Sequence, residues 1–306
     1  MRDTFIGQLK QRAVGDPRIM LITGDLGFGV FDRYREDCPK QFLNAGIAEQ
    51  NMTMVATGMA MEGRIVFTYS IGNFSTLRCL EQIRNDACYH NTDVKIVSIG
   101  GGFSYGALGI SHHATEDLAI MRALPNMTVV APCGLWEAKQ ATDALIDTPG
   151  TFFLRLDKSS GCDEPLQQEE VFRLGRARIL KEGTDVAIIV TGGILGEVQK
   201  AADILEFSGV SVKIVSVHTI KPFDVGLVLD IAREIKTVVT VEEHTVIGGL
   251  GSAVAETLLD NGVQPKAFLR IGLGDRFSSM VGSQAYLRQQ YGLDASAIAG
   301  KIRKLI

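Results

Sequence analysis

Residues 41–52 read Gln-Phe-Leu-Asn-Ala-Gly-Ile-Ala-Glu-Gln-Asn-Met, and this stretch organises the rest of the chain. It predicts an extended segment that turns between Asn44 and Gly46 and enters a helix running to about Glu62. Asn44 is a typical helix N-cap residue, and Gly63 is a typical residue at which a helix stops. The expected helix carries apolar or small residues on most of its sides, which predicts that it is buried.

Glu49 lies in the first turn of this expected helix, where its only polar neighbours are Gln50 and Asn51. A carboxylate taken into apolar surroundings needs a charged or hydrogen-bonding partner, or it takes up a proton. Such a carboxylate suits a functional site. The alternative is a solvated glutamate that stabilises the start of the helix through the helix dipole. The neighbouring residues leave both interpretations open.

The composition excludes several classes of protein. The chain has 306 residues, 46% of them hydrophobic, which is enough for two domains with separate cores. A net charge of −4 indicates no nucleic-acid-binding surface, and no apolar run is long enough to predict a membrane span. The five cysteines are scattered, which favours reduced thiols over disulfides or a zinc site. The first residues lack an apolar signal segment, so we expect a cytoplasmic protein without a membrane contact.

Strand-like and helix-like segments alternate along both halves of the chain. The expected strands are Val/Ile-rich runs at residues 18–23, 64–69, 94–99, 128–131, 151–156, 185–191, 211–217, 237–241 and 267–271. Such runs, separated by helices, predict parallel sheets covered on both faces. A polar segment without apolar periodicity separates the halves and is typical of a linker. We therefore expect an α/β fold of two doubly wound domains, residues 1–160 and 177–306, joined by a linker at 161–176.

Two glycine-rich loops follow expected strands. Residues 24–29 read Gly-Asp-Leu-Gly-Phe-Gly, and residues 100–109 read Gly-Gly-Gly-Phe-Ser-Tyr-Gly-Ala-Leu-Gly. Loops at strand ends are usual ligand contacts in open α/β sheets, and the second loop is apolar enough that we expect it to line a cavity. The first loop does not fit a dinucleotide fingerprint, and the chain lacks a P-loop and a G-x-S-x-G elbow. A Gly-Asp-Gly segment followed by an asparagine, which could hold magnesium and a pyrophosphate, is also absent.

Individual polar and aromatic residues near these loops each have two interpretations. Asp25 is a ligand contact or a turn residue, and Phe74 is a site aromatic or a core residue. Arg155 is an anion contact or part of a surface ion pair. His112 and His113 are adjacent, which does not suit a metal site; one of them is an acid/base or donor residue, or a structural histidine.

Taken together, these motifs resemble those of the transketolase family of thiamine diphosphate enzymes. Residues 44–52 resemble the family's G-I-A-E-Q segment, and residues 24–26 resemble the loop after its first strand. Residues 74–84 are similar to its F-x-x-x-R-x-x-[DE]-Q-[VI]-R stretch, and residues 111–127 to its T-H-Q-x-x-E-D-x-A-x-x-R-x-x-P-N-M stretch. Residues 248–254 resemble the signature of the second domain, so the resemblance covers essentially the whole chain.

The resemblance implies a domain organisation. The first domain would bind the pyrimidine of thiamine diphosphate, and the second would be the family's C-terminal domain. The family's pyrophosphate-binding domain is missing from the sequence, so the chain resembles the second subunit of a split transketolase-like enzyme. A separate polypeptide would hold the diphosphate and Mg²⁺, and two chains of each kind would form a heterotetramer.

The resemblance also implies residue roles. Glu49 would hydrogen-bond the pyrimidine ring nitrogen and favour the imino tautomer, and Phe74 would stack on the ring. Asp25 and Arg78 match positions close to the cofactor. His112 matches a histidine of the substrate cleft that could hydrogen-bond the sugar. The matching positions for a sugar phosphate are Arg2 and Arg155, whose guanidinium groups suit a phosphate dianion.

The sequence departs from the family where substrates are usually bound. Gly100 and Leu108 stand at places where typical members have a histidine and an aspartate, and Ile71 replaces an aromatic residue. These changes make the donor site more apolar. We therefore expect transfer of a two-carbon ketol or acyl unit to an aldose-type acceptor, with a specialised sugar or a 2-oxoacid as substrate.

Two other kinds of function remain possible. One keeps the fold but changes the reaction, as in the beta subunit of a 2-oxoacid dehydrogenase decarboxylase or a deoxyxylulose-phosphate-synthase-like chain. The other is a non-catalytic regulatory or scaffold subunit, against which the presence of Glu49 and Phe74 argues.

Overall fold

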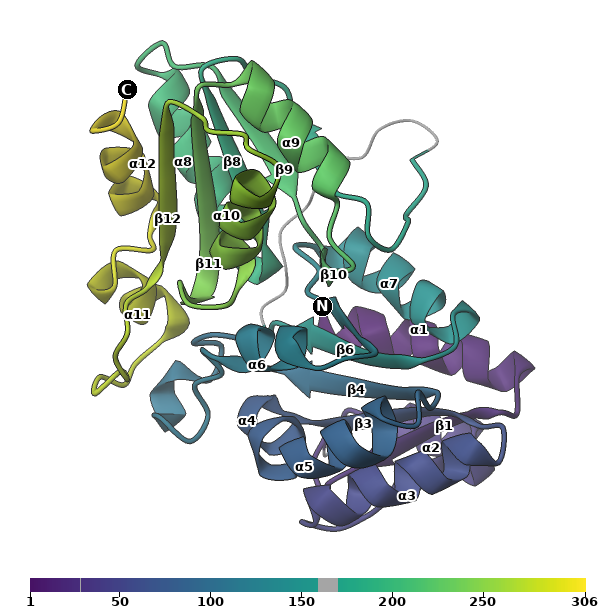
Figure 1. Ribbon diagram of the computed structural model, residues 1–306. Coiled ribbons are helices and arrows are strands. Elements are labelled where there is room, and N and C mark those ends of the chain that lie inside the picture. Colours follow the sequence, from purple (N-terminus) through teal and green to yellow (C-terminus); the bar gives the residue numbers. More distant parts are fainter. Residues whose placement is uncertain (28, 159–169) are drawn as a thin grey trace.

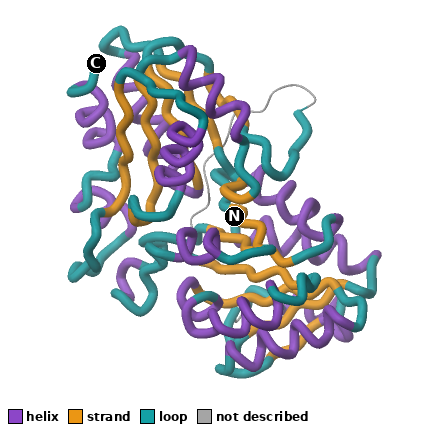
Figure 2. Tube along the Cα trace, in the orientation of Figure 1, coloured by secondary structure: helices purple, strands orange, loops and turns teal. Residues whose placement is uncertain are grey.

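A computed structural model describes residues 1–27, 29–158 and 170–306 of the protein (Figure 1). Two α/β domains lie one on the other, and each is built around one sheet. Helices cover both faces of both sheets (Figure 2), which confirms the predicted fold class. No helix among the described residues is long and apolar enough to cross a membrane.

The first sheet has seven strands in the order β10-β5-β6-β4-β3-β1-β2. Its pairs are parallel, as predicted, except for the antiparallel pair of β10 and β5. The strands are β1 (Ile19–Thr23), β2 (Phe42–Asn44), β3 (Ile65–Ile71), β4 (Val94–Ile99), β5 (Met127–Val130), β6 (Thr151–Leu156) and β10 (Thr219–Lys221). The sequence predicts a turn at 219–223, but residues 219–221 form β10. The second half of the chain therefore contributes an edge strand to the first sheet.

The second sheet has five strands in the order β12-β11-β8-β9-β7. Its strands are β7 (Arg178–Lys181), β8 (Val186–Thr191), β9 (Val212–Ser216), β11 (Thr237–Thr245) and β12 (Ala267–Leu273). β7, which the sequence does not predict, pairs antiparallel with β9, and the other pairs are parallel.

The helices divide between the sheet faces in a regular way. The helices of the first domain are α1 (Arg2–Gly15), α2 (Asp32–Asp37), α3 (Glu49–Met61), α4 (Gly72–Ser75), α5 (Leu80–Gln82), α6 (Asp117–Ala123) and α7 (Leu135–Asp147). Those of the second are α8 (Leu195–Glu206), α9 (Val225–Glu234), α10 (Leu250–Asp260), α11 (Gln284–Gln290) and α12 (Ala295–Arg303). α1, α2 and α7 pack on one face of the first sheet, and α3 and α6 pack on the other.

α3 begins later than the sequence predicts. Ala48 is its N-cap, so the assignment of Asn44 as N-cap is wrong. Asn44 instead ends β2, and its amide oxygen accepts hydrogen bonds from the backbone N–H groups of Asp25 and Gly46, both at 3.0 Å. The predicted stop is confirmed, because the helix ends at Met61 and Gly63 adopts a φ of +83°.

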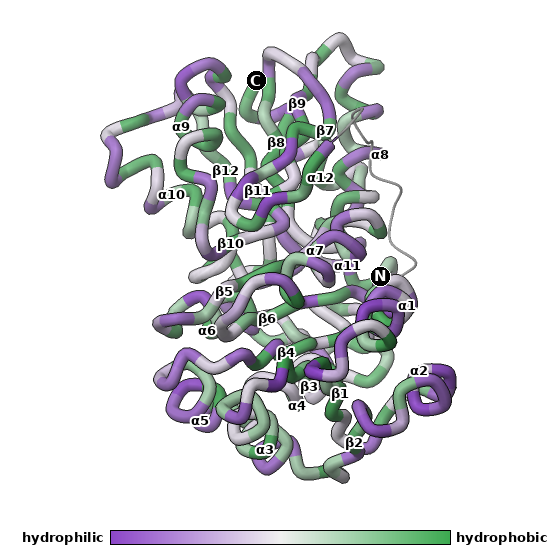
Figure 3. The backbone as a smooth tube through the Cα atoms, turned by 90° about the vertical axis from the view of Figure 1, so that its right-hand side faces the viewer, coloured by the Kyte–Doolittle hydropathy of each residue, from purple (hydrophilic) through white to green (hydrophobic). Residues whose placement is uncertain are grey.

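One face of α3 is exposed, although the sequence predicts a helix buried on most sides. Met54 and Met61 lie seven residues apart, about two turns, and are 47% and 54% exposed. Ile47, just before the helix, is 75% exposed. We call these three residues the α3 stripe. Figure 3 shows hydrophobic residues in α3, whereas α2 is hydrophilic along most of its length.

Two other helix predictions need correction. The helix expected at 75–88 is broken into α4, a short turn at Leu77–Cys79, α5 and a π-helical segment at Ile83–Cys88. The helix expected from Ser111 or Thr115 begins only at Asp117, because the preceding residues form an irregular loop.

Most of the predicted linker lies outside the described residues. The described part of the linker begins at Glu170, and not all of it is a polar surface segment. Phe172 stacks on the ring of His218 at 4.2 Å, and Glu170 pairs with Arg178 at 2.6 Å. This end of the segment therefore packs against the protein.

Candidate functional site

Glu49 is buried at the first turn of α3, where it is only 2% exposed. Its Oε2 accepts a hydrogen bond from a terminal nitrogen of Arg78 at 2.9 Å. Its Oε1 accepts no hydrogen bond from the described residues. The solvated helix-end carboxylate considered from the sequence is therefore wrong. Glu49 is a paired, buried carboxylate with one oxygen open to a further donor.

Phe74, on α4, lies beside this ion pair. The guanidinium carbon of Arg78 is 4.3 Å from the centre of the Phe74 ring, and the ring of His112 meets Phe74 edge-on at 5.1 Å. Phe74 is half-buried and not a core residue. Glu49, Arg78, Phe74 and His112 therefore form one continuous cluster of acid, cation, aromatic ring and imidazole, which we call the Glu49 cluster.

The two adjacent histidines have different surroundings. His112 is half-buried, and its Nδ1 lies 2.9 Å from the Ser111 hydroxyl. Burial, with the neighbouring His113, lowers the pKa of His112, so the neutral imidazole is favoured. His113 is 1% exposed, and its Nε2 donates to the carbonyl of Gly106 at 3.1 Å. His112 is thus the histidine available for chemistry, and His113 is structural.

Asp25 lies at the carboxyl end of β1, next to the Glu49 cluster. Its carboxylate accepts a hydrogen bond from the Asn44 side chain at 2.9 Å, and its φ is +57°. The preceding residue, Gly24, is so close to Glu49 that an added Cβ would lie 3.5 Å from the Glu49 Cγ. The ends of β1 and β2 are adjacent because these strands are paired. This pairing brings the loop at 24–29 next to the turn at 44–46.

Arg2 is the first residue of α1. It pairs with Asp3 at 2.7 Å and lines a pocket of about 450 Å³ with Arg33. Burial raises the pKa of Tyr105, whereas the charge of Arg2 lowers it. The Tyr105 ring is 6.1 Å from the His112 ring. Tyr105 is therefore within electrostatic range of Arg2, and its ring lies near that of His112.

Arg155 has a different environment from Arg2. It is 3% exposed, and its Nε donates to Asp117 at 2.9 Å. Its Nη2 donates to the carbonyls of Ala114 at 2.9 Å and Glu243 at 3.1 Å. A surface ion pair, one of the two interpretations from the sequence, is therefore wrong. Arg155 ties the two domains together.

The buried charges at this domain junction extend beyond Arg155. Glu243, on β11, accepts a hydrogen bond from Arg288 of α11 at 2.6 Å. Asp157 is also buried, and its burial, with repulsion from Glu243, raises its pKa to about 6. We call Asp117, Arg155, Asp157, Glu243 and Arg288 the junction network.

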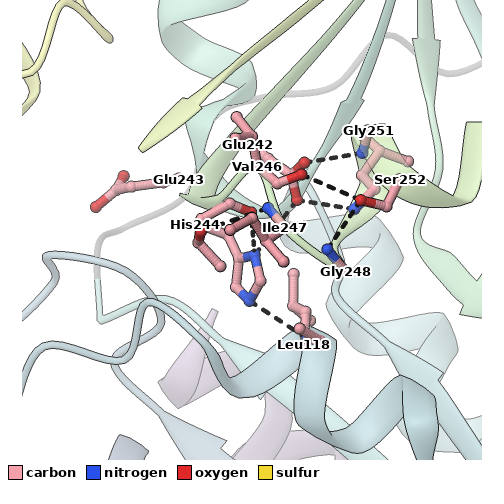
Figure 4. Close-up of polar contacts among 12 residues, drawn as sticks. Leu118, Glu242, Glu243, His244, Val246, Ile247, Gly248, Gly251 and Ser252 are labelled. Atoms are coloured by element: carbon pink, nitrogen blue, oxygen red, sulfur yellow. Dashed lines mark hydrogen bonds and ion pairs between the residues drawn. The ribbon is translucent and has the colours of Figure 1, made fainter. Parts of the chain in front are cut away.

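His244 and Glu242 lie on the opposite side of β11 from Glu243 (Figure 4). The sequence shows no nearby partner for His244 and favours a structural histidine; in the structure its Nδ1 donates to the carbonyl of Thr245 at 2.7 Å. Its Nε2 accepts from the backbone of Ala119 in α6 at 3.3 Å. Burial lowers the pKa of His244 to about 4. The neutral ring thus joins the two domains.

Glu242 occupies the glycine-rich start of α10. Its two carboxylate oxygens accept hydrogen bonds from the N–H groups of Leu250 and Gly251, each at 2.8 Å (Figure 4). The first turn of a helix is a common anion site. Here the chain's own carboxylate fills it, so this turn does not favour an external phosphate.

We expect the stability of a Glu242→Gln variant to rise with pH relative to that of the unaltered protein. Burial raises the pKa of Glu242 from 4.5 to about 7, so the folded protein binds more protons than the unfolded chain between these values. The contribution of Glu242 to folding therefore falls as pH rises through this window. The unfolding free energy of Glu242→Gln minus that of the unaltered protein should increase by up to about 3 kcal/mol between pH 4 and 8. Denaturant titration of both proteins measures this difference. A difference that is constant with pH would contradict this account.

The loop at 100–109 packs against the second domain through part of its length. An added Cβ at Gly100 would lie 2.2 Å from the Tyr105 ring, so a side chain at this position would require the ring to move. Phe103 is buried, and its ring stacks on Tyr291 at 5.3 Å. Leu108, in contrast, is 56% exposed. Phe103 lines a small pocket with Leu273 and Tyr291, so the expectation of a cavity-lining loop has support at the buried end.

Sequence analysis missed Tyr105 and most of the junction network. Asp117 lies within one of the motifs, but nothing in that motif links it to Arg155. Glu243 and Arg288 stand outside every motif. In the described part of the chain, no three His, Cys, Asp or Glu side chains are grouped as a metal site would require.

Comparison with known proteins gives two family matches. Residues 1–163 match the pyrimidine-binding domain of transketolase, and residues 175–298 match the transketolase C-terminal domain. An apulose-4-phosphate transketolase subunit from Phocaeicola vulgatus is 33% identical over 298 residues, which cover 97% of this chain and 94% of the relative. A 1-deoxy-D-xylulose-5-phosphate synthase from Thermomicrobium roseum is 37% identical over 98% of this chain, which corresponds to 48% of the relative.

A solved structure supports the same assignment. It is described as a split gene transketolase, inactive beta4 tetramer, and it matches with a TM-score of 0.88 at 34% identity. The match covers 99% of this chain and 97% of the other. The family matches account for both domains in their order along the chain. With these full-length relatives, they show that the chain belongs to the transketolase family and corresponds to the subunit of split transketolases that carries the pyrimidine-binding and C-terminal domains.

Proposed function

We propose that the chain is one half of a thiamine diphosphate-dependent enzyme that transfers a two-carbon ketol unit to an aldose-type acceptor. The Glu49 cluster is the observation that carries this proposal. A buried carboxylate with one open oxygen lies beside a half-buried aromatic ring and a basic side chain. This set suits a flat nitrogen heterocycle that stacks on one side and donates or accepts hydrogen bonds at its edge.

The residues present fit the pyrimidine of thiamine diphosphate, the cofactor that the family implies. Thiamine diphosphate would supply a carbon nucleophile and a thiazolium ring that takes up the electron pair of the broken bond. Glu49 would hold a proton between its Oε1 and a ring nitrogen, and Phe74 would stack on the ring. Arg78 would keep the Glu49 carboxylate in position through the bond at 2.9 Å.

The remaining predicted residues have supporting roles in this proposal. Asp25 would contact the cofactor from the end of β1. His112 is favoured as a neutral imidazole, and since its Nδ1 bonds with Ser111, its Nε2 can donate to or accept from a substrate hydroxyl, depending on the tautomer. Arg2 would hold a substrate phosphate, the role that the resemblance implies for its position. We do not assign this task to Arg155, because its guanidinium is buried against Asp117 and two carbonyl groups.

The α3 stripe supports the need for a partner subunit. Exposed apolar residues gathered on one face mark protein interfaces. Ile47 lies two positions before Glu49, and Leu77, which is 43% exposed, lies next to Arg78. The apolar surface therefore borders the cofactor residues. A partner chain that covers it would hold the diphosphate and Mg²⁺ against the Glu49 cluster, in a heterotetramer of two chains of each kind in the cytoplasm.

A second reaction on the same site has specific support. The relative from Thermomicrobium roseum is a 1-deoxy-D-xylulose-5-phosphate synthase, and the relative from Phocaeicola vulgatus belongs to a transketolase for apulose-4-phosphate. The exposed Leu108 makes this end of the loop apolar, which suits a donor with few hydroxyl groups. Acyl transfer from a 2-oxoacid is therefore the alternative to ketol transfer.

The test is an assay of the two-chain enzyme. The chain is co-purified with a separate pyrophosphate-binding subunit, and thiamine diphosphate and Mg²⁺ are supplied. Ketol transfer from sugar donors to aldose acceptors is then measured in parallel with pyruvate consumption and reduction of a dye by 2-oxoacids. We expect ketol transfer by the complex and none by either chain alone. Dye reduction without ketol transfer would contradict the proposal in favour of a dehydrogenase component.

We expect Phe74→Ala to weaken binding of thiamine diphosphate to the two-chain enzyme. Stacking of a pyrimidine on an aromatic side chain contributes about 1–3 kcal/mol, so the dissociation constant should rise roughly tenfold to a hundredfold. Calorimetric titration measures this change. Phe74→Tyr keeps the ring and should bind within about threefold of the unaltered enzyme. Equal affinities of all three proteins would count against the stacking role.

A further inference from the structure

The C-terminal domain contacts the loop at 100–109 through one carboxylate. The Oε1 of Glu243 accepts a hydrogen bond from the backbone N–H of Phe103 at 2.6 Å. Gln284 of α11 donates to both oxygens of Glu243, at 3.0 and 3.1 Å, and to the hydroxyl of Ser104 at 3.3 Å. The loop of one domain is therefore held by side chains of the other.

Only a glycine at position 102 allows this close approach. An added Cβ at Gly102 would lie 2.6 Å from the Oε1 of Glu243, and the φ of Gly102 is +59°. A side chain there would push the carboxylate away from Phe103. The glycine-rich character of the loop thus has a specific cause at this position, the packing of the loop on Glu243.

The same loop is joined to the segment that carries His112. Gly102 and Ala114 exchange two backbone hydrogen bonds, at 2.8 and 3.0 Å. His113 donates from its ring to Gly106, as described above, and its ring meets Phe103 edge-on at 5.0 Å. A displacement of the loop would therefore displace His112, whose backbone lies between these attachments.

The charge of Glu243 is balanced within the second domain. Arg288 donates to the Oε2 of Glu243 at 2.6 Å, and α11 carries both Arg288 and Gln284. The backbone carbonyl of Glu243 also accepts from Arg155, which binds Ala114 in the same way. Arg288 and Arg155 thus fix Glu243 in place, and its Oε1 binds the loop through Phe103.

We infer that Glu243 is a positioning residue of the C-terminal domain, which orients the loop at 100–109 and, through it, His112 for substrate binding. This inference rests on the proposed function, in which that loop and His112 contact the substrate. It assigns the C-terminal domain a task in an active site built on the first domain.

The test compares Glu243→Gln with Glu242→Gln. The neighbouring carboxylates are 3% and 1% exposed, but Glu242 points to the opposite side of β11, where it accepts hydrogen bonds from the start of α10 and lies 3.6 Å from Nδ1 of His244 (Figure 4). Hydrogen exchange of the backbone amides at 101–109 is measured on the intact chain. KM and kcat for the acceptor are measured on the two-chain enzyme.

For Glu243→Gln we expect about tenfold faster amide exchange in the loop, because the loop is bound less firmly. We also expect about tenfold higher KM for the acceptor. The value of kcat should change less than KM, because the cofactor residues are unaltered. Glu242→Gln should leave both quantities unchanged. Equal effects of the two substitutions, or unaltered loop exchange in Glu243→Gln, would overturn the inference. If no protein turns over substrate while the exchange results follow this expectation, the proposed function fails and the positioning of the loop stands.

Discussion

Replacing Glu49 with glutamine should lower turnover by the two-chain enzyme by about 10²–10⁴-fold, the usual contribution of a positioned acid–base group. Glutamine has nearly the same shape as glutamate, and its amide oxygen can still accept the bond from Arg78. It cannot exchange a proton with a ring nitrogen of the cofactor. The substitution therefore removes the proposed chemical role of Glu49 and retains its packing.

A suitable control for Glu49→Gln is Glu62→Gln, because Glu62 is exposed at the other end of the same helix. That variant should turn over substrate at the unaltered rate. Assembly of both variants with the partner is checked by gel filtration, so that loss of activity is not confused with loss of the complex. An assembled Glu49→Gln enzyme that retains its activity would contradict the assigned role.

Replacing Arg155 with methionine should lower the free energy of unfolding by about 3–5 kcal/mol, because it leaves the carboxylate of Asp117 buried without its cation. The side chains of Arg155 and Asp117 are 2% and 0% exposed, so water cannot take the place of the guanidinium. The same substitution also removes the donor to the carbonyls of Ala114 and Glu243. Denaturant titration of the single chain measures the effect.

A double variant separates the ion pair from general damage to the core. Arg155→Met combined with Asp117→Leu removes both charges and should recover part of the lost stability. Arg18→Met, which removes an exposed pair with Asp16, should change stability little. If Arg155→Met is as stable as the unaltered protein while the enzyme loses affinity for phosphorylated substrates, Arg155 acts as the phosphate contact first expected from the sequence.

Much of the Glu49 cluster could be predicted because each of its residues belongs to a motif that resembles the transketolase family; their positions alone left other interpretations open. Parallel strands place their carboxyl ends along one edge, so motifs that are distant in sequence meet there. Glu49, Arg78, Phe74 and His112 follow this rule. The N-cap of α3 was less predictable, since Asn44 is equally suited to capping a helix or closing a turn. The contact of its amide with Asp25 depends on the pairing of β1 and β2.

The domain junction could not be predicted in the same way. Its contacts join residues far apart in the chain, as in the bond between Phe103 and Glu243, and no local pattern specifies such a pair. Lys221 and its neighbours read as a turn because the run at 219–221 is too short for a strand by itself. It becomes β10 only when β5 of the other domain provides hydrogen-bonding partners. The burial of Arg155 could not be predicted for the same reason, because it results from the packing of the second domain.

The central claim is that this chain contributes half of a thiamine diphosphate site. Calorimetric titration of thiamine diphosphate with Mg²⁺ into the chain, its partner and their mixture tests it most directly. We predict saturable binding by the mixture, with one cofactor per pair of chains, and much weaker binding by either chain alone. No binding by the mixture, or equally tight binding by the partner without this chain, would contradict the account.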